Sequence, residues 1–250
     1  MDAASLPPLG SLARSRALLT AFTYEQTDPA RFYALLAADS ARQVAAYGEL
    51  TGRTVLDVGG GPGYFADAFR ALGATYVGLD ADAGELSLHG REVTRGTVLG
   101  SGLDLPFRTG SVDVCYSSNV LEHVPAPERM ADEMVRVTRP GGLVFLSYNN
   151  WLAPNGGHET APWHYLGGRW AAERYTRRNG SRPKNDYGVS LFRTTVAQML
   201  RWKDAQVRSG AVEVVEVLPR YHPSWARWVV RLPAVREVLT WNLLLVLRRA

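Results

Sequence analysis

The stretch Val55-Leu56-Asp57-Val58-Gly59-Gly60-Gly61-Pro62-Gly63-Tyr64-Phe65 decides the fold of this chain. Residues 54–58 form a short apolar run that is typical of a buried parallel strand. A glycine-rich turn follows, and a helical pattern then extends over about 62–72. Glycines suit this turn because the backbone must bend sharply and let a ligand approach without a Cβ in the way. The order strand, tight turn, helix predicts the opening of a nucleotide-binding α/β unit.

The spacing of the glycines distinguishes between nucleotides. The dinucleotide fingerprint G-x-G-x-x-G would place its third glycine at position 64, which is Tyr64. The chain instead has an acid two residues before three alternating glycines, namely Asp57-x-Gly59-x-Gly61-x-Gly63. This pattern resembles motif I of the class I S-adenosylmethionine (SAM) methyltransferases, in which it holds the methionine end of the cofactor. A glycine-rich turn that binds nothing is the alternative.

A second acid stands at the end of the next predicted strand. Residues 76–79 form this strand, and Asp80 and Ala81 follow it directly. A carboxylate here can accept two charge-assisted hydrogen bonds from ribose hydroxyls. An aspartate would also suit the N-cap of a following helix, and the two roles are compatible. We therefore expect Asp80 and Ala81 to lie at the cofactor, with a weak helix over 84–93.

The adenine end of the expected cofactor site departs from the family pattern. The stretch 98–107 reads VLGSGLDLPF, where the family usually has G-D-A-x-x-L-P-F with an aspartate for the adenine amino group. Ser101 takes the place of that aspartate. Its hydroxyl, or the backbone of Gly102 and Leu103, is expected to contact adenine. Asn119, just after a strand over 112–116, is expected to flank the sulfonium.

Residues 53–147 closely resemble the UbiE-like, "type 11" methyltransferase family. The resemblance rests on Leu121-Glu122-His123-Val124, a helix over 125–138, and Arg139-Pro140-Gly141-Gly142 before a strand over 143–147. The wording DVGGGPGYF and SSNVLEHV also resembles a group of actinobacterial methyltransferases over most of the chain. The resemblance implies a Rossmann-like α/β fold, with a seven-stranded, mostly parallel sheet in the order 3-2-1-4-5-7-6 and helices on both faces.

The chain is expected to form a single methyltransferase domain over 1–250, since its length fits one large domain. Its parts are, in order, an N-terminal helical cap, a SAM-binding core, a substrate lid and the rest of the sheet, at 1–50, 51–147, 148–190 and 191–250. The lid is inferred because long aperiodic loops in compact domains are usually functional.

Elements outside the core follow from local pattern. Asp28-Pro29 predicts a helix start, and further helices and strands are expected over 13–22, 29–50, 169–180, 194–202, 212–218 and 243–247. Tyr24 and Tyr33 of the cap either touch the cofactor or pack, and packing is favoured. Residues 223–241 combine Trp with Arg; this stretch either packs on the sheet or lies as a peripheral contact on a membrane surface.

Methyl transfer to a hydroxyl needs a proton acceptor. The candidates are His123, His158 and His164, with the carboxylates Glu122 and Glu159 beside them. His123 follows the fourth strand, where ligands bind in parallel sheets, although a structural role is equally open. Glu122 is favoured as a brace for the backbone.

A metal and a nucleic-acid partner are both disfavoured. Related quinone O-methyltransferases bind a divalent ion through E-x-x-E-H, but Asn119 replaces the first Glu here, so we expect no metal. Base-modifying amino-methyltransferases carry an Asn/Asp-Pro-Pro-aromatic run that is missing after 118. A basic cluster could bind phosphate or be an ordinary solvated helix face; it consists of Arg169, Arg174, Arg177, Arg178, Arg182 and Lys184.

Composition suggests a protein of the cytoplasm. The net charge is +4, and Cys115, the single cysteine, allows no disulfide within the chain. The start lacks the apolar core of a signal peptide, and no apolar run is long enough to span a bilayer. The sequence thus predicts a SAM-dependent methyltransferase acting on a small-molecule or a glycan- or lipid-linked hydroxyl. A non-catalytic partner protein of the same fold and an NAD(P)-dependent oxidoreductase are the alternatives.

Overall fold

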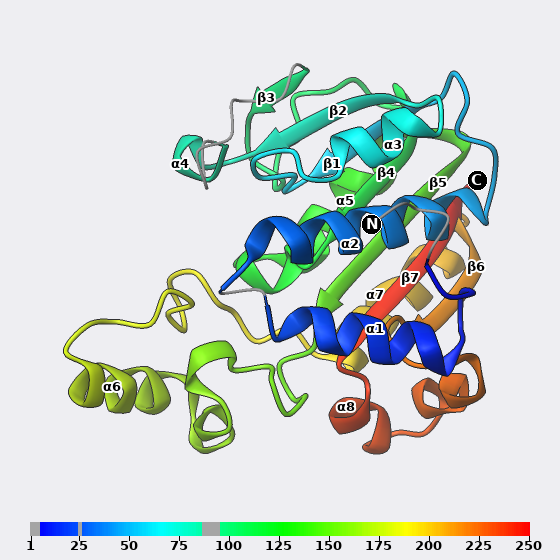
Figure 1. Cartoon of the computed structure of the whole chain (residues 1–250). Coiled ribbons are helices and arrows are strands. Elements are labelled where there is room, and N and C mark those ends of the chain that lie inside the picture. The colour runs from blue at the N-terminus through cyan, green and yellow to red at the C-terminus, as the bar shows by residue number, and fades with distance from the viewer. Residues whose placement is uncertain (1–5, 25–26, 87–95) are drawn as a thin grey trace.

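A seven-stranded sheet in the order β3-β2-β1-β4-β5-β7-β6 organises the molecule (Figure 1). The computed structural model describes residues 6–24, 27–86 and 96–250. The strands are β1 (Thr54–Val58), β2 (Thr75–Asp80), β3 (Thr97–Leu99), β4 (Val112–Ser118), β5 (Thr138–Asn149), β6 (Val212–Pro219) and β7 (Asn242–Arg249). The pairs from β3 to β5 are parallel, whereas β7 is antiparallel to both β5 and β6. The predicted fold and strand order are confirmed.

Helices cover both faces of this sheet. The α-helices are α1 (Leu12–Phe22), α2 (Pro29–Ala45), α3 (Ala66–Ala71), α4 (Ala83–Leu86), α5 (Pro127–Val137), α6 (Gly168–Asn179), α7 (Val196–Arg208) and α8 (Val235–Leu239). Shorter 3-10 helices are η3 (Leu121–His123), η4 (His158–Thr160), η5 (Trp163–Leu166) and η6 (Ser224–Arg231). In the described parts of the chain, no helix combines the length and apolarity that crossing a membrane requires.

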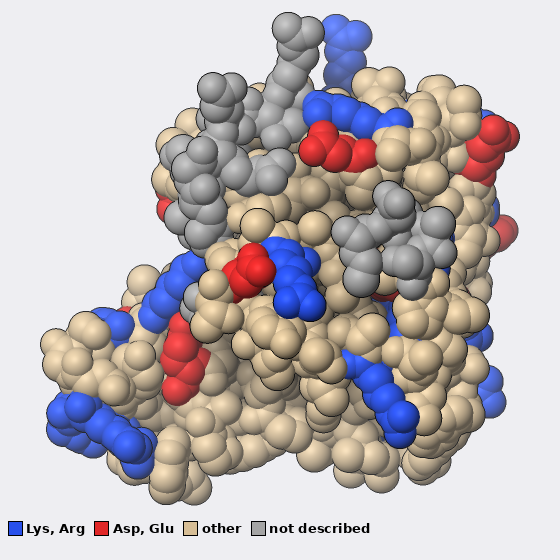
Figure 2. Space-filling model, in the orientation of Figure 1, with Lys and Arg blue, Asp and Glu red and all other residues tan. Residues whose placement is uncertain are grey.

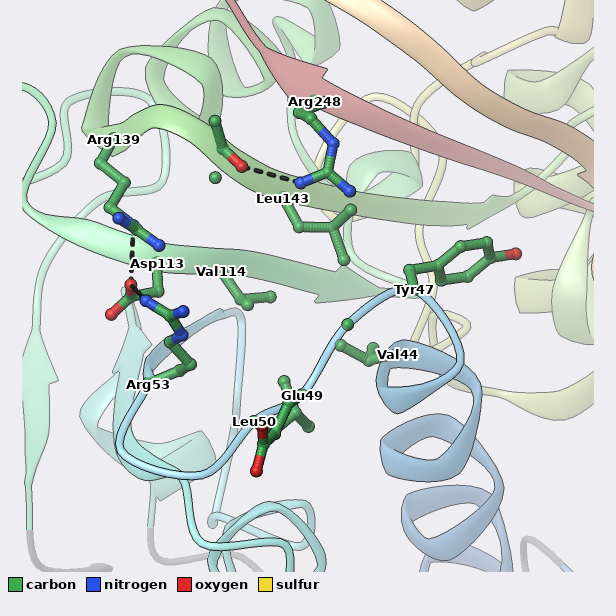
Figure 3. A pocket seen from close by; sticks show the side chains of 13 residues that line it. Val44, Tyr47, Glu49, Leu50, Arg53, Asp113, Val114, Arg139, Leu143 and Arg248 are labelled. Carbon is green, nitrogen blue, oxygen red and sulfur yellow. Dashed lines mark hydrogen bonds and ion pairs between the residues drawn. The ribbon is translucent and has the colours of Figure 1, made fainter.

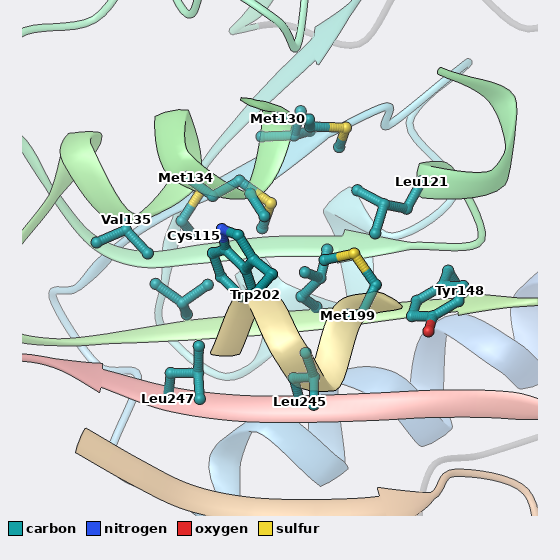
Figure 4. Close-up of a cluster of buried hydrophobic side chains, with 14 of the residues drawn as sticks. Cys115, Leu121, Met130, Met134, Val135, Tyr148, Met199, Trp202, Leu245 and Leu247 are labelled. Atoms are coloured by element: carbon teal, nitrogen blue, oxygen red, sulfur yellow. The ribbon is translucent and has the colours of Figure 1, made fainter. Parts of the chain in front are cut away.

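Two apolar cores lie on opposite faces of the sheet. One packs α5 and α7 against the strands, and Figure 4 shows Met130 and Met134 of α5 above Cys115 of β4, with Met199 of α7 nearby. Residues four apart on a helix share a face, so Met130 and Met134 both point into this core. The other core packs α1, α2 and α3 through residues such as Phe32.

Several predicted boundaries were wrong. The helix expected over 29–50 ends at Ala45, because the chain must turn through Gly52, which has a φ of +70°, to start β1. The helix expected from residue 62 begins at Ala66, because the glycine turn continues through a hydrogen bond from Gly63 N–H to the Gly60 carbonyl. Of the helix expected over 84–93, only the first residues are described, as part of α4; 87–95 lie outside the described residues.

Other predicted elements are longer or divided in the structure. The strand expected over 143–147 is the centre of β5, which runs to Asn149, and the helix expected to end at residue 202 continues to Arg208. The amphipathic stretch over 223–241 divides into η6 and α8, since Pro233 lacks the N–H that would continue a helix. The predicted N-cap is confirmed, because Asp28 accepts the N–H of Arg31 at 3.2 Å.

A buried polar network fixes the N-terminal helices to the sheet. Arg14 of α1 donates two 2.7 Å hydrogen bonds to Asp39 of α2 and a third bond to the carbonyl of Arg220. The Arg220 guanidinium is itself fully buried and donates to four side chains, those of Ser40, Gln43, Ser118 and Ser147. The two arginines therefore join α1 and α2 to the carboxyl ends of β4, β5 and β6.

The opposite, amino-terminal edge of the sheet carries a small hollow of about 140 Å³ (Figure 3). Asp113 at the start of β4 forms ion pairs there with Arg53 at 3.2 Å and Arg139 at 2.7 Å. Its other oxygen accepts the N–H of Thr54 at 2.8 Å. These bonds brace the starts of β1, β4 and β5. The hollow lies at the far edge from the glycine turn, so we do not assign it to the nucleotide site.

Candidate functional site

The glycine turn after β1 forms a tight backbone loop at the carboxyl edge of the sheet. The N–H groups of Gly59 and Gly60 both donate to the Leu79 carbonyl, at 2.7 and 3.1 Å. Gly59, Gly61 and Gly63 have φ values of +80°, +50° and +77°, which side-chain-bearing residues rarely adopt. Space within 4 Å of Gly61 is open where a Cβ would stand, so a ligand can approach the backbone there.

Asp80 faces this turn from the end of β2. Its Oδ2 accepts the N–H of Gly61 and its Oδ1 accepts the N–H of Asp82, both at 3.0 Å. Each carboxylate oxygen can accept a further bond, which leaves capacity for two hydroxyls. The neighbouring Ala81 is exposed. Asp82, and not Asp80, fills the capping role, because Asp82 Oδ1 accepts the N–H of Gly84 at 2.7 Å.

Asp57 lies beneath the turn rather than on its surface. It is almost fully buried, and Tyr76 of β2 donates its hydroxyl to Asp57 Oδ2 at 2.7 Å. Burial raises the pKa of Asp57 to about 7; the Tyr76 hydrogen bond opposes this rise and the charge of Asp80 adds to it. A Cβ on Gly60 would stand 3.2 Å from Asp57 Oδ2. Asp57 therefore supports the turn from below, which suits an indirect role at the methionine end.

The loop 100–103 lies beside Asp80, and its contact with adenine stays a prediction. Gly100 donates its N–H to the Asp80 carbonyl at 2.8 Å, and Ser101 Oγ accepts the N–H of Leu103 at 3.1 Å. Gly102 packs closely on the end of β1, since a Cβ there would stand 3.2 Å from Val58 Cγ1. Ser101 is exposed, so its hydroxyl can contact a ligand.

Asn119, directly after β4, has a left-handed backbone with a φ of +58°. Its N–H donates to the Ser147 carbonyl at 2.9 Å, and its side chain is held on both sides. Asn242 Nδ2 donates to Asn119 Oδ1 at 2.7 Å, while Asn119 Nδ2 donates to the Tyr221 hydroxyl at 3.3 Å. The side chain is thus directed along the sheet edge toward β7, and contact with a sulfonium stays a prediction.

Two of the predicted histidines meet at this edge although they are 35 positions apart in the chain. The rings of His123 and His158 have centroids 5.4 Å apart. His123 Nδ1 lies 2.7 Å from the Ser190 carbonyl, so this nitrogen carries the hydrogen of that bond; in the neutral ring Nε2 then has the lone pair. Burial lowers the pKa of His158 to about 4, and electrostatic repulsion from His123 is the second cause of this decrease.

Glu122 completes a three-residue cluster with these histidines. Its Oε1 accepts the N–H of Asn149 at 3.0 Å, which matches the predicted bracing role. Its Oε2 is buried and has no partner among the described residues, and the same holds for His158 Nε2. Burial raises the pKa of Glu122. The donor atoms of the three residues lie within 4.8 Å of one another, a spacing that would also admit a metal ion.

The remaining candidates, His164 and Glu159, are not members of this cluster, although both lie near enough for their charges to act on His158. His164 is 1% exposed and packs edge-on against Trp151, with ring centroids 5.1 Å apart. Burial lowers its pKa. Glu159 is exposed at the lid surface and accepts two bonds from Asn185 Nδ2, at 3.0 and 3.1 Å. The structure therefore separates a packing histidine, His164, from the pair formed by His123 and His158.

Sequence reasoning missed three residues that shape the site. Tyr76 donates a hydrogen bond to Asp57, and Asn242 donates one to Asn119. The Ser190 carbonyl orients the ring of His123 through a hydrogen bond with Nδ1. A polar side chain inside an otherwise apolar strand was the only signal for Tyr76 and Asn242. Nothing in the sequence pointed to Ser190, because a backbone carbonyl is common to every residue.

Comparisons with known proteins agree with this geometry. Residues 56–146 match a family model described as a methyltransferase domain. An uncharacterized methyltransferase of Mycobacterium marinum is 52% identical over 246 residues, covering 95% of this chain and 94% of the relative. One of Mycolicibacterium gilvum is 54% identical over 249 residues, covering 95% of each chain.

Solved structures show the same architecture. The crystal structure of an S-adenosylmethionine-dependent methyltransferase from Mesorhizobium loti superposes with a TM-score of 0.57. The sequences are 22% identical, and the match covers 85% of this chain and 97% of that one, so this likeness concerns the fold. The relatives establish the family at high identity and nearly full length. This chain belongs to the methyltransferase family of these relatives, with the fold of solved SAM-dependent methyltransferases.

Proposed function

We propose that this chain binds SAM at the carboxyl ends of β1, β2 and β4 and methylates a hydroxyl oxygen of a small-molecule or a glycan- or lipid-linked acceptor. The open backbone at Gly61 and the remaining acceptor capacity of Asp80 support cofactor binding at this place. Gly59, Gly61, Gly63 and Asp57 would hold the methionine end, Asp80 and Ala81 the ribose, Ser101, Gly102 and Leu103 the adenine, and Asn119 the sulfonium side.

The pairing of His123 with His158 is the observation that favours a hydroxyl acceptor. The Ser190 carbonyl orients His123 so that its Nε2 can accept a proton. His158 is a poor proton acceptor, because burial lowers its pKa to about 4 and keeps its ring neutral above that pH. We therefore assign the proton acceptor to His123 and the support of that ring to His158.

Bound SAM would supply a methyl group that its sulfonium has already made electrophilic. What remains for the protein is to orient the acceptor oxygen in line with that methyl group and to take up its proton. His123 Nε2 takes the proton that the hydroxyl loses as its oxygen forms the new bond to carbon. The methyl–sulfur bond would break in the same step, and S-adenosylhomocysteine would leave as the neutral thioether. Glu122, in the same cluster, accepts a hydrogen bond from the N–H of Asn149 and so positions the backbone there. His164 lies in the packing of the lid and has no assigned part in this step.

Titration calorimetry with SAM, S-adenosylhomocysteine and NADH tests the cofactor assignment. Asp80→Ala should weaken SAM binding by about 1.5–3 kcal/mol, because a charged hydrogen-bond acceptor for the ribose is lost. Asp82→Ala is the matched control, since it removes the same charge two residues away. Equal weakening by both variants would contradict the ribose role of Asp80. Binding of NADH instead of SAM would favour the oxidoreductase, and binding of neither would favour the non-catalytic partner protein.

The base assignment is tested on an acceptor found by screening metabolite and lipid fractions for methyl uptake. His123→Ala should lower kcat by about 100-fold, in the range typical of lost general-base catalysis. The Ala variants of His158 and His164 serve as comparisons. Retention of full turnover by all three variants would refute the assignment. Unchanged activity in a chelator would agree with the expectation that no metal takes part.

A further inference from the structure

Large apolar side chains that face solvent gather on residues 225–239, which include most of η6 and all of α8. Six exposed large apolar residues lie here: Trp225, Trp228, Leu232, Val235, Val238 and Leu239. Trp225 is 69% exposed and Trp228 is 47% exposed. A contiguous apolar patch of this kind marks an interaction site.

The packing of η6 does not require these two tryptophans. The inward face of η6 is formed by Ala226, Val229 and Val230, all of them buried. This face packs on β6, and α8 packs on both η6 and α7. Trp225 and Trp228 project from the other side. The segment therefore has one face that completes the fold and one apolar face that the described chain leaves uncovered.

Helix α1 extends this uncovered face. The residues just before α1 lie against the start of η6, because Ser224 donates its N–H to the Gly10 carbonyl at 2.7 Å. Leu12, Arg16 and Leu19 share one side of α1 at helical spacing, and all three are exposed. Figure 1 shows the start of α1 beside the orange turns of η6. We call the outward sides of α1, η6 and α8 together the docking face.

The exposed charges of the docking face are positive. Arg16 and Arg231 are exposed, and Arg231 pairs with no acid among the described residues. Glu237 turns inward, where its two oxygens accept the N–H groups of Val196 and Ala197 at the start of α7, at 3.1 and 2.8 Å. In the view of Figure 2, the surface over α1 and α8 shows blue side chains and no red ones.

We propose that the docking face binds the surface of an anionic lipid bilayer. Tryptophans sit well at the boundary between lipid headgroups and acyl chains, and arginines around them complement negative headgroups. The residues carry both features on one continuous side of the molecule. A protein partner with a mixed charge pattern would match this surface less well, because the docking face offers cations and no exposed acid to pair with its positive groups.

The docking face also adjoins the candidate site. Asn150, directly after β5, donates from Nδ2 to the carbonyls of Glu237 and Thr240, at 2.5 and 3.2 Å. Asn242, two residues beyond Thr240, bonds Asn119. A bilayer held against α8 would thus lie near the edge of the sheet that carries His123. This step rests on the proposed methyl transfer, and it favours a lipid-linked acceptor over a freely soluble one.

Sedimentation with vesicles tests the proposal on the whole chain without SAM. Wild type should bind vesicles that contain phosphatidylglycerol, bind vesicles of phosphatidylcholine alone more weakly, and lose affinity as salt rises. The double variant Trp225→Ala/Trp228→Ala should bind at least about tenfold more weakly, because the apolar anchors are lost. Arg231→Glu should also weaken binding, whereas Arg208→Glu, at the other end of α7, should leave it unchanged.

Three results would overturn the proposal. These are absence of wild-type binding, equal loss in Arg231→Glu and Arg208→Glu, and binding that the double tryptophan variant retains. Light scattering adds a further outcome: a wild-type dimer that the double variant breaks would mean that a second copy covers the docking face. SAM titration of the same variants separates the bilayer proposal from the proposed methyl transfer. Loss of vesicle binding with SAM binding retained concerns the docking face alone, and the reverse result concerns the cofactor site alone.

Discussion

Alanine at position 59 should disrupt the glycine turn for two separable reasons. Gly59 has a φ of +80°, and its Cβ would stand 2.4 Å from Val120 Cγ2 and 2.6 Å from Cγ1. Left-handed strain costs about 1 kcal/mol, and forcing a methyl group into an occupied space adds about 1–3 kcal/mol. Gly59→Ala should therefore lower the free energy of unfolding by about 2–4 kcal/mol in total.

A matched variant isolates the contribution of the clash. Gly61 also has a positive φ, of +50°, but a Cβ there meets nothing within 4 Å, so Gly61→Ala should cost only about 1 kcal/mol. Adding Val120→Ala to Gly59→Ala removes both overlapping methyl groups. The double variant should then be more stable than the sum of the single effects by about 1–2 kcal/mol.

Urea unfolding followed by tryptophan fluorescence measures these differences, and SAM titration shows whether the turn still binds. Equal destabilisation by Gly59→Ala and Gly61→Ala would refute the clash with Val120. Strict additivity in the double variant would refute it as well. Either result would mean that Val120 is not packed against the turn as the structure shows.

Three further predictions concern buried ionisable groups. Arg220→Ala should lower the free energy of unfolding by about 3–5 kcal/mol, because four side chains lose a buried donor. Urea unfolding measures this change, and the control Arg208→Ala, at an exposed position, should change the free energy of unfolding by less than about 0.5 kcal/mol. His158, with its pKa lowered from 6.5 to about 4, should make the protein less stable as pH falls through that window, and His158→Asn should remove this dependence. Asp57 has the opposite sign: its pKa is raised from 3.8 to about 7, so stability should decline as pH rises between these values, and Asp57→Asn should remove the decline in urea midpoints.

Local pattern was enough to predict most of the sheet. The strand over 54–58 and the turn at Gly59 could be recognised because buried strands and glycine turns have signatures within a few residues. The strand order needed the resemblance to known methyltransferases, since pairing partners such as β5 and β7 are nearly a hundred residues apart. Helix ends were least predictable, as α2 shows, because tertiary packing and the route of the chain decide where a helix stops.

The candidate site was only partly predictable for a similar reason. Asp80 could be placed because its position after a strand defines its place on the sheet edge. The meeting of His123 with His158 could not, because the lid has no periodicity that would reveal its path. The burial of Arg220 was equally hidden, since four partners from three separate segments, α2, β4 and β5, together satisfy a side chain that is usually exposed.

The hydrogen-bond network around Arg14 and Arg220 limits how ligands can enter and leave the candidate site. To swing away from the sheet, the N-terminal helices would have to part Arg14 from the Arg220 carbonyl and Ser40 from the Arg220 guanidinium while exposing Phe32 to water. If this costs about 4 kcal/mol, the open form makes up roughly one molecule in a thousand. This side of the molecule is thus closed in nearly all molecules at equilibrium. Ligands of the candidate site are therefore expected to enter and leave without displacement of the N-terminal helices in nearly all molecules.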